Sequence, residues 1–130
     1  MSIFEYKNLR LRRGEWLEDL LKVLADENRL RMINLMHEGE LCVCELEAIL
    51  ETSQSNVSRH LARLRNEEIV VFERKAQWTY YQLNPSFLEK HAPLIDYLID
   101  QMQKEEVFVK DLKQLDLYKQ GKIHCGLMTG

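Results

Sequence analysis

Apolar residues recur every three or four positions through the first part of this chain, which is the spacing of amphipathic helices. Two such stripes flank the polar stretch Asp26-Glu27-Asn28, and their members are Trp16, Leu20, Leu21 and Leu24 before it and Leu30, Ile33, Leu35 and Met36 after it. Gly39 ends the second stripe, because glycine commonly terminates a helix. The pattern therefore predicts two short helices with a cap between them.

Two more helices are predicted to follow, separated by a short turn. The third begins near Leu41, and Thr52 or Ser53 offers an N-cap for the fourth. Their apolar stripes are Val43, Leu46 and Leu50 in the third helix and Val57, Leu61 and Leu64 in the fourth. A short helix, a three-residue turn and a second helix form a helix-turn-helix pattern.

The sequence period changes after Glu68. Residues 69–72 and 78–83 are rich in β-branched and aromatic residues, so they predict the two strands of a β hairpin with Arg74-Lys75-Ala76-Gln77 at its tip. The predicted fold class is therefore mainly α, with a two-stranded β wing after the helix-turn-helix.

A long helix is predicted from Pro85 to about Lys104, followed by a short helix from Val107 to Tyr118 and a polar tail. The apolar positions of the long helix exceed the needs of one small domain. We therefore expect this helix and the first one to form a dimer interface.

The composition suits one compact domain of 130 residues, of which 45% are hydrophobic. No apolar run approaches the roughly 20 residues that cross a bilayer, and the N-terminus lacks the apolar stretch of a signal peptide, so we expect a cytoplasmic protein without membrane contact. Three cysteines, an odd number, fit a disulfide framework poorly and favour free thiols. The chain has neither a Gly-rich phosphate loop nor a Ser/His/Asp arrangement, and no enzymatic activity is expected.

The net charge of −3 is distributed unevenly. Residues 7–13 form a basic arm without acids, residues 54–83 are also rich in arginine, and most acids lie elsewhere. A DNA-binding protein with an acidic remainder releases DNA readily, because only a few phosphate contacts hold it there.

Small, polar and basic side chains occupy the face of the fourth helix opposite its apolar stripe. They are Ser55, Asn56, Arg59, Ala62 and Arg63, with Gln54 and Ser58 at the edges. Gln and Asn can pair with adenine, Arg with guanine, and Ser with phosphate or base, so this face suits the major groove of double-stranded DNA. Arg74 and Lys75 can reach the backbone or minor groove as a wing. The alternative is an ordinary solvated helix face.

Cys42 and Cys44 stand at the start of the third helix. Successive helical residues are about 100° apart, so the two sulfurs are expected about 200° apart on an intact helix. One ion could then bind both only if the first turn unwound, which would couple binding to the helix that supports the fourth. Thiolates suit Zn(II), Cd(II), Pb(II) and As(III), and Cys125 in the tail is the remaining sulfur for a third ligand, for which water or a buffer thiol could substitute.

Several segments together resemble the ArsR/SmtB family of winged-helix metalloregulators. Leu30-Arg31-Met32-Ile33-Asn34-Leu35-Met36 is similar to its second helix, residues 53–61 to its recognition helix, and residues 78–84 to its second wing strand. The resemblance spans about residues 15–100 and implies a homodimer that represses its own operon and leaves the operator when an inducer binds. It also implies that His60 lies at a recognition-helix position that touches the DNA backbone.

The segment Glu40-Leu41-Cys42-Val43-Cys44-Glu45-Leu46 is similar to the inducer box of the arsenite-responsive and cadmium/lead-responsive branches. Some arsenite sensors have a third cysteine three residues after the pair, where this chain has Glu47. The zinc site on the family's dimer helix is not expected, because only His91, Asp96 and Asp100 are present in that region.

The sequence thus predicts a winged helix-turn-helix repressor that binds operator DNA as a homodimer and is released by As(III), with Sb(III) as a further candidate inducer. The expected organisation is a basic arm over residues 1–13, a DNA-binding and dimerisation domain over 14–106, and a C-terminal helix and flexible tail over 107–130. Three alternatives remain: a Cd/Pb/Zn-responsive repressor, a redox switch in which Cys42 or Cys44 pairs with Cys125, and an interaction module that binds no DNA.

Overall fold

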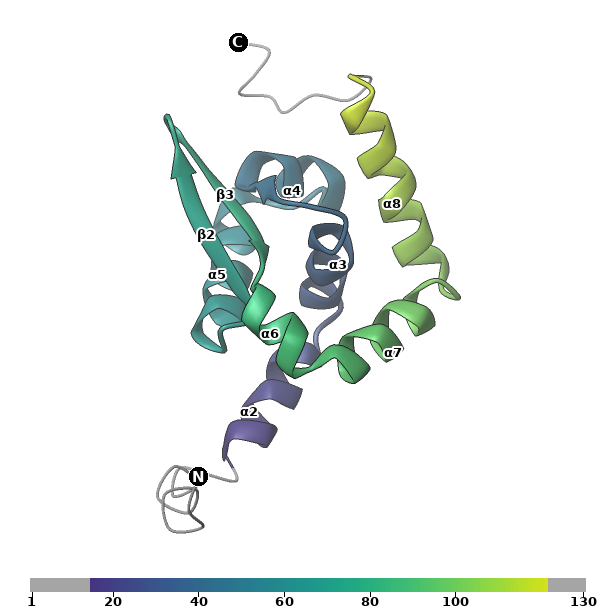
Figure 1. Ribbon diagram of the computed structural model, residues 1–130. Helices are drawn as coiled ribbons and strands as arrows, with labels where there is room; N and C mark the ends of the chain where they lie inside the picture. The colour runs from purple at the N-terminus through teal and green to yellow at the C-terminus, as the bar shows by residue number, and fades with distance from the viewer. Residues whose placement is uncertain (1–14, 122–130) are drawn as a thin grey trace.

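The centre of the fold is a group of three helices, α3 (Glu27–Met36), α4 (Val43–Leu50) and α5 (Gln54–Asn66), in a computed structural model that describes residues 15–121 (Figure 1). Polar side chains begin two of them. Asp26 accepts a hydrogen bond from the backbone N–H of Arg29 at 3.0 Å, and Ser53 accepts one from Asn56 at 3.1 Å. Both caps lie where the sequence predicted helix starts, so the helix-turn-helix α4–α5 is confirmed.

The hydrophobic core lies where these helices meet. Val57, Leu61 and Leu64 of α5 are completely buried and pack in one cluster with apolar residues of α3 and α4, including Ile33 and Leu46. Burial of each large aliphatic side chain contributes about 1.5–3 kcal/mol to stability. The core therefore holds the base of α5 rigidly and leaves its opposite face outside.

A three-stranded antiparallel sheet adjoins α5, with the order β1-β3-β2. Its strands are β1 (Leu41–Cys42), β2 (Val70–Lys75) and β3 (Trp78–Leu83). The predicted hairpin is confirmed, but its tip is narrower than expected, because Arg74 and Lys75 belong to β2 and only residues 76–77 form the turn, with Ala76 at a φ of +56°. The additional strand β1 was not predicted, since two residues are too few to show a period.

The prediction of one long helix after Pro85 was wrong. The structure has two helices, α6 (Pro85–Lys90) and α7 (Ala92–Met102), with a break at His91. Pro93 explains the break. A continuous helix would place its ring against the carbonyl of Glu89, and proline has no N–H to bond there. Helix α6 therefore ends at its C-cap His91, whose N–H donates to the carbonyl of Phe87 at 2.8 Å.

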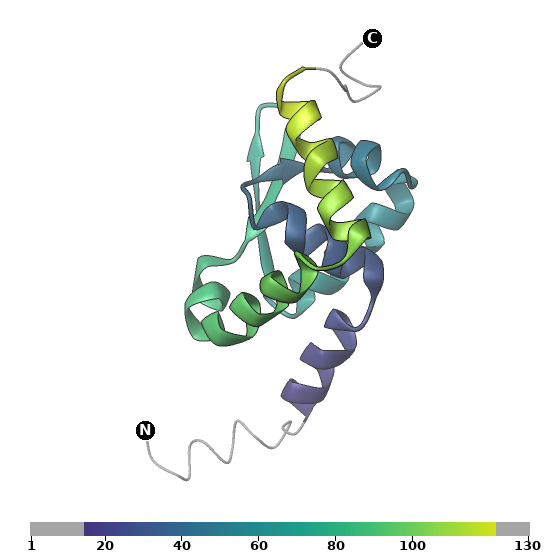
Figure 2. The same cartoon turned by 90° about the vertical axis from the view of Figure 1, so that its right-hand side faces the viewer.

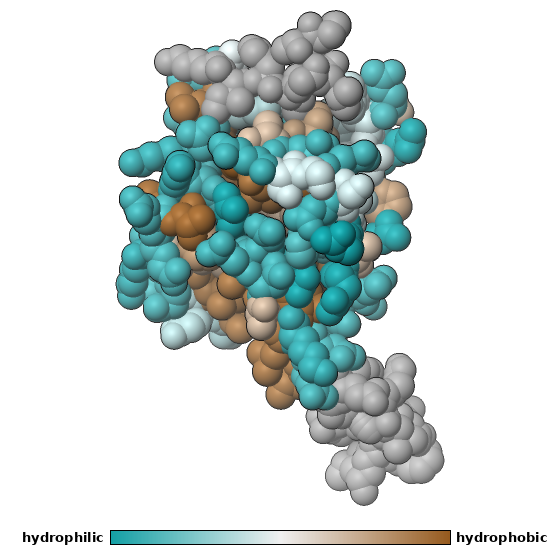
Figure 3. Space-filling view, turned by 180° about the vertical axis from the view of Figure 1, so that it is seen from behind, coloured by the Kyte–Doolittle hydropathy of each residue, from teal (hydrophilic) through white to brown (hydrophobic). Residues whose placement is uncertain are grey.

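Helix α2 (Glu15–Leu24) extends away from the body of the molecule, as Figures 1 and 2 both show. Its side chains Leu17 and Leu21 are 64% and 51% exposed. Viewed from behind, hydrophobic residues gather towards the lower end of the molecule (Figure 3). This helix therefore offers an apolar surface that residues 15–121 leave uncovered.

Helix α8 (Glu106–Lys119) packs across α3 and α4. Asp111 accepts two hydrogen bonds from the guanidinium of Arg31, at 2.7 and 2.9 Å, and Asn34 donates one to the carbonyl of Phe108 at 3.2 Å. The helix predicted from Val107 to Tyr118 is confirmed and is attached to the core by buried polar contacts. Within residues 15–121, no helix is long and apolar enough to span a membrane.

Candidate DNA interface and cysteine site

The exposed face of α5 brings together most of the residues predicted to read DNA. Gln54, Ser55, Ser58, Arg59 and Arg63 are exposed on it. Asn56 is half-buried: it donates to the hydroxyl of Thr52 at 3.0 Å and accepts from the guanidinium of Arg59. The face thus presents amide, hydroxyl and guanidinium groups from one rigid helix, a set that can bind base edges and phosphates.

His60, which was also predicted to contact DNA, does not lie on this exposed face. Its side chain is buried, and its Nδ1 lies 3.0 Å from a guanidinium nitrogen of Arg29. The helical period explains this, because residues three and four positions apart share a face and position 60 falls between Val57 and Leu64 of the apolar stripe. The same guanidinium donates to the carbonyls of Val23 at 2.6 Å and Lys22 at 3.3 Å, so His60 and Arg29 join α5 to the end of α2.

Burial lowers the pKa of His60 below its ordinary value of about 6.5, and Arg29, Arg59 and Arg63 add to this effect against the opposing charge of Asp26. The unfolded chain therefore binds a proton at His60 more readily than the folded protein does. We expect the free energy of unfolding to fall as the pH drops below about 6.5, with a slope from this one proton of at most about 1.4 kcal/mol per pH unit. Urea denaturation from pH 7.5 to 5 will measure it.

Two substitutions test the assignment of this slope to His60. His60→Gln keeps an acceptor for Arg29 but cannot take up the proton, so its stability should depend less on pH than that of the unaltered protein. His37→Gln is the matched control, because the side chain of His37 is exposed. An equal pH slope in His60→Gln and the unaltered protein would contradict the assignment.

The wing strand β2 carries the other predicted DNA contacts, Arg74 and Lys75, both exposed. The ammonium of Lys75 lies 2.5 Å from a carboxylate oxygen of Glu40 and 5.3 Å from the centre of the Tyr80 ring. Sequence reasoning missed Glu40, since 35 residues separate it from Lys75 and no local period links them. The wing is therefore basic at its end but is tied to the residue that precedes β1.

The sulfurs of Cys42 and Cys44 lie 3.0 Å apart, so the expectation that they flank the helix on opposite sides was wrong. The reason is that Cys42 precedes the helix. It has an extended backbone, φ −92° and ψ 166°, and pairs with Tyr80 in the sheet, while Cys44 is in the first turn of α4. The 200° separation holds only when both residues are helical. The two sulfurs thus lie close together without unwinding of α4.

Aromatic side chains surround the cysteine pair, which is 5% exposed at Cys42 and 8% at Cys44. Trp78 and Tyr80 of β3 and Tyr118 of α8 pack against the two residues. Trp78 and Tyr80 share a face because side chains alternate along a strand, and this period could have located them from the sequence. Burial raises the pKa of the Cys42 thiol, the backbone N–H of Glu45 opposes this, and the negative charge of the Glu45 carboxylate adds to it.

The third predicted sulfur, Cys125, and the basic arm over residues 7–13 lie outside the described residues. Within residues 15–121, no cluster of three or more His, Cys, Asp or Glu side chains could hold a metal ion. The described part of the site therefore supplies two sulfur atoms, and a divalent ion that requires four ligands would need others.

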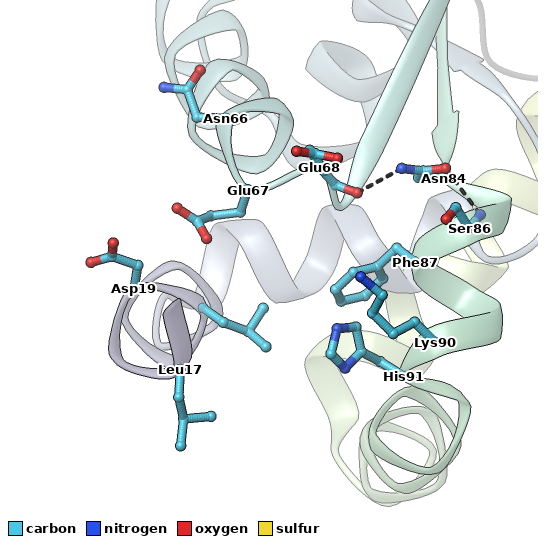
Figure 4. A pocket seen from close by; sticks show the side chains of 11 residues that line it. Leu17, Asp19, Asn66, Glu67, Glu68, Asn84, Ser86, Phe87, Lys90 and His91 are labelled. Atoms are coloured by element: carbon cyan, nitrogen blue, oxygen red, sulfur yellow. Dashed lines mark hydrogen bonds between the residues drawn. The ribbon is translucent and has the colours of Figure 1, made fainter. Parts of the chain in front are cut away.

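A groove of about 710 Å³ lies elsewhere, between α2, the end of α5 and the start of α6. Asp19 and Glu67 lie on one side of it, and Phe87, Lys90 and His91 lie on the other (Figure 4). Burial and the charge of Asp19 raise the pKa of Glu67. The groove adjoins the exposed Leu17 of α2. It thus continues the apolar surface of α2 that the described part of the chain leaves uncovered.

Comparisons with known proteins agree with this architecture. The profile described as "Bacterial regulatory protein, arsR family" matches residues 26–71. The arsenic resistance transcriptional regulator ArsR1 of Pseudomonas putida is 45% identical over 86 residues, which are 65% of this chain and 67% of that protein. The arsenical resistance operon repressor of Escherichia coli is 36% identical over 108 residues, 82% of this chain and 92% of that repressor.

A solved structure shares the fold. It is a homodimeric winged helix-turn-helix DNA-binding domain from Mycobacterium bovis, with a TM-score of 0.62 over 71% of this chain and 85% of that domain, at 20% identity. The family profile, the two arsenic-resistance regulators and this architecture lead to one conclusion. The chain belongs to the ArsR family of winged helix-turn-helix transcriptional regulators, which are DNA-binding proteins and not enzymes.

Proposed function

We propose that this protein is a homodimeric repressor that binds its operator through α5 and the wing and is released when As(III) binds Cys42 and Cys44. The observation that carries the proposal is the 3.0 Å separation of the two sulfurs at the junction of β1 and α4. Related proteins named as arsenical resistance repressors support the choice of inducer. Sb(III), which also prefers sulfur ligands, is a further candidate.

In the reduced protein, Cys42 and Cys44 supply thiols that fit arsenite chemically. Arsenite is As(OH)₃ in neutral water, and each thiol that binds replaces one hydroxide, which leaves as water with the thiol proton. No oxidant or reductant is needed. Cys125 is proposed as a third ligand, for which water or a small thiol could substitute if it lies too far away. The aromatic shell of Trp78, Tyr80 and Tyr118 limits access of water to the sulfurs.

The DNA-binding mode proposed here uses two subunits. The exposed Leu17 and Leu21 of α2 and Tyr97 of α7, which is 62% exposed, support a dimer interface on these helices. Two copies of α5 could then enter successive major grooves of a symmetric operator. Gln54, Ser55, Asn56, Ser58, Arg59 and Arg63 are proposed to contact bases and phosphates there, and Arg74 and Lys75 the flanking backbone.

A redox switch in which Cys42 or Cys44 pairs with Cys125 is the second candidate, because the two described sulfurs lie 3.0 Å apart and cysteines at such a site could also respond to peroxide. Oxidation of two thiols by hydrogen peroxide would form one disulfide and release two molecules of water. Such a switch would lose DNA affinity with peroxide and regain it with a reductant, without any metal ion.

Fluorescence anisotropy on the upstream promoter DNA distinguishes these functions. We expect the reduced protein to bind, and arsenite to weaken binding by roughly 5- to 150-fold, the usual range of allosteric coupling. Cd(II), Zn(II) and peroxide are titrated in parallel. Release by a divalent ion or by peroxide, but not by arsenite, would contradict the proposed inducer. If Gln54→Ala/Ser55→Ala/Arg59→Ala bound as tightly as the unaltered protein, α5 would not be the DNA interface.

A further inference from the structure

A continuous set of contacts joins the cysteine pair to the basic end of the wing. Cys42 is paired with Tyr80 across β1 and β3, and the Tyr80 ring packs against the cysteine pair. The ammonium of Lys75 lies 5.3 Å from the centre of that same ring. Lys75 in turn contacts the carboxylate of Glu40, which immediately precedes β1. The contacts thus return to the strand on which they began.

The sheet links the wing to β1. β3 is the middle strand of the sheet and pairs with β1 on one edge and with β2 on the other. Residues 41 and 42 pair with residues 81 and 80, respectively. A shift of Cys42 on ligand binding would therefore be transmitted through the strand pairing and the Glu40–Lys75 ion pair to the end of β2, where Arg74 and Lys75 lie.

We propose that Glu40 and Lys75 form a positioning pair that couples the cysteine site to the wing, so that the inducer releases DNA partly by moving the basic end of the wing. This inference rests on the proposed function, since it requires an inducer at Cys42 and Cys44. The pair would give the inducer site a second structural connection to the DNA-binding surface, in addition to the connection through α4 and α5. Glu40 contacts neither the inducer nor DNA in this mechanism and acts through Lys75.

The size of the expected effect follows from the exposure of the pair. The Glu40 and Lys75 side chains are 36% and 47% exposed, so solvent screens their attraction. An exposed ion pair changes an equilibrium constant by up to about fivefold. Removing the ion pair should therefore reduce the arsenite-induced loss of DNA affinity without abolishing it. The remaining loss would measure the coupling through α4.

The experiment compares the ratio of DNA dissociation constants with and without arsenite, since changes in basal affinity cancel in this ratio. In Glu40→Gln we expect the ratio to be roughly two- to fivefold smaller than in the unaltered protein. Glu73→Gln is the matched control. It also removes one negative charge near Lys75, from β2, but leaves Lys75 paired with Glu40. Its ratio should equal that of the unaltered protein.

A double-mutant cycle tests whether the pair acts as a unit. Lys75→Gln should lower the ratio as Glu40→Gln does, and the two changes together should lower it no further, because either one removes the contact. The exchange Glu40→Lys/Lys75→Glu restores an ion pair with reversed charge and should regain part of the coupling. A merely structural role of Glu40 predicts no such rescue.

Arsenite binding is measured separately, from the loss of titratable thiols and the ultraviolet absorbance of As–S bonds. If Glu40→Gln binds arsenite normally and its ratio is unchanged, the positioning role is overturned while the proposed function stands. If the unaltered protein fails to bind arsenite, both are overturned. Reduced arsenite binding by Glu40→Gln would place Glu40 in the inducer site itself and also overturn a positioning role.

Discussion

Cys42→Ser is expected to abolish release by arsenite while the variant still binds promoter DNA. The hydroxyl of serine is a poor ligand for thiophilic ions, so the site would retain one described sulfur and lose the chelate. The arsenite-induced loss of DNA affinity should fall from roughly 5- to 150-fold to less than about twofold. Anisotropy titrations with arsenite, on the same DNA as the unaltered protein, provide the measurement.

The substitution should leave the fold intact, so the result can be interpreted. Cys42 is the N-cap of α4, a position where serine is among the favoured residues, and the change is nearly isosteric. Cys44→Ser should give the same loss of response. Cys125→Ser serves as the comparison within the chain: a retained response would mean that a small molecule supplies the third ligand. Full release of the Cys42→Ser variant by arsenite would rule out the proposed pair.

Asp111→Ala should produce the largest loss of stability. Asp111 is 2% exposed and accepts two hydrogen bonds from Arg31, whose pKa it raises. Removing Asp111 leaves the half-buried guanidinium of Arg31 without its charged partner, which costs up to about 3–5 kcal/mol. For a chain of this size the midpoint of thermal unfolding should fall by roughly 10–20 °C. Circular dichroism at 222 nm during heating measures the shift.

Two variants separate the loss of this ion pair from a general effect on α8. Asp116→Ala changes an exposed carboxylate on the same helix and should alter stability by less than about 0.5 kcal/mol. Arg31→Met/Asp111→Leu replaces both charges by apolar groups and should recover most of the lost stability, because no unpaired charge remains. If Asp111→Ala and Asp116→Ala unfolded at the same temperature, the pair would not secure α8 to the core.

The pair between Arg31 and Asp111 matters for the inducer site as well. α8 carries Tyr118, which packs against the cysteine pair, and Asp111 holds the same helix against α3. The chain segment after residue 106 was expected as a separate helix and tail. In the structure, α8 also contributes Phe108 and Leu115 to the buried residues, so it closes one side of the site.

Local sequence patterns were sufficient to predict the helices of the DNA-binding unit. The Asp26 and Ser53 caps, the stripe over Val57, Leu61 and Leu64, and the hairpin composition each depend on residues close together in the chain. The resemblance to the ArsR family, which the comparisons confirm, came from the order of these segments. The break at His91 was also encoded locally, by Pro93, but the apolar pattern across it concealed the effect.

What the sequence by itself determined about this protein is its set of secondary-structure elements, the exposed polar face of α5 and the presence of two nearby thiols. Tertiary structure alone decided how those thiols are arranged. Pairing of Cys42 with Tyr80 keeps that residue extended and turns its sulfur towards Cys44, whereas a helical period would have separated them. The Glu40–Lys75 and Arg31–Asp111 pairs join residues far apart in the chain. Such contacts depend on how complete elements pack, and no local pattern of residues specifies them.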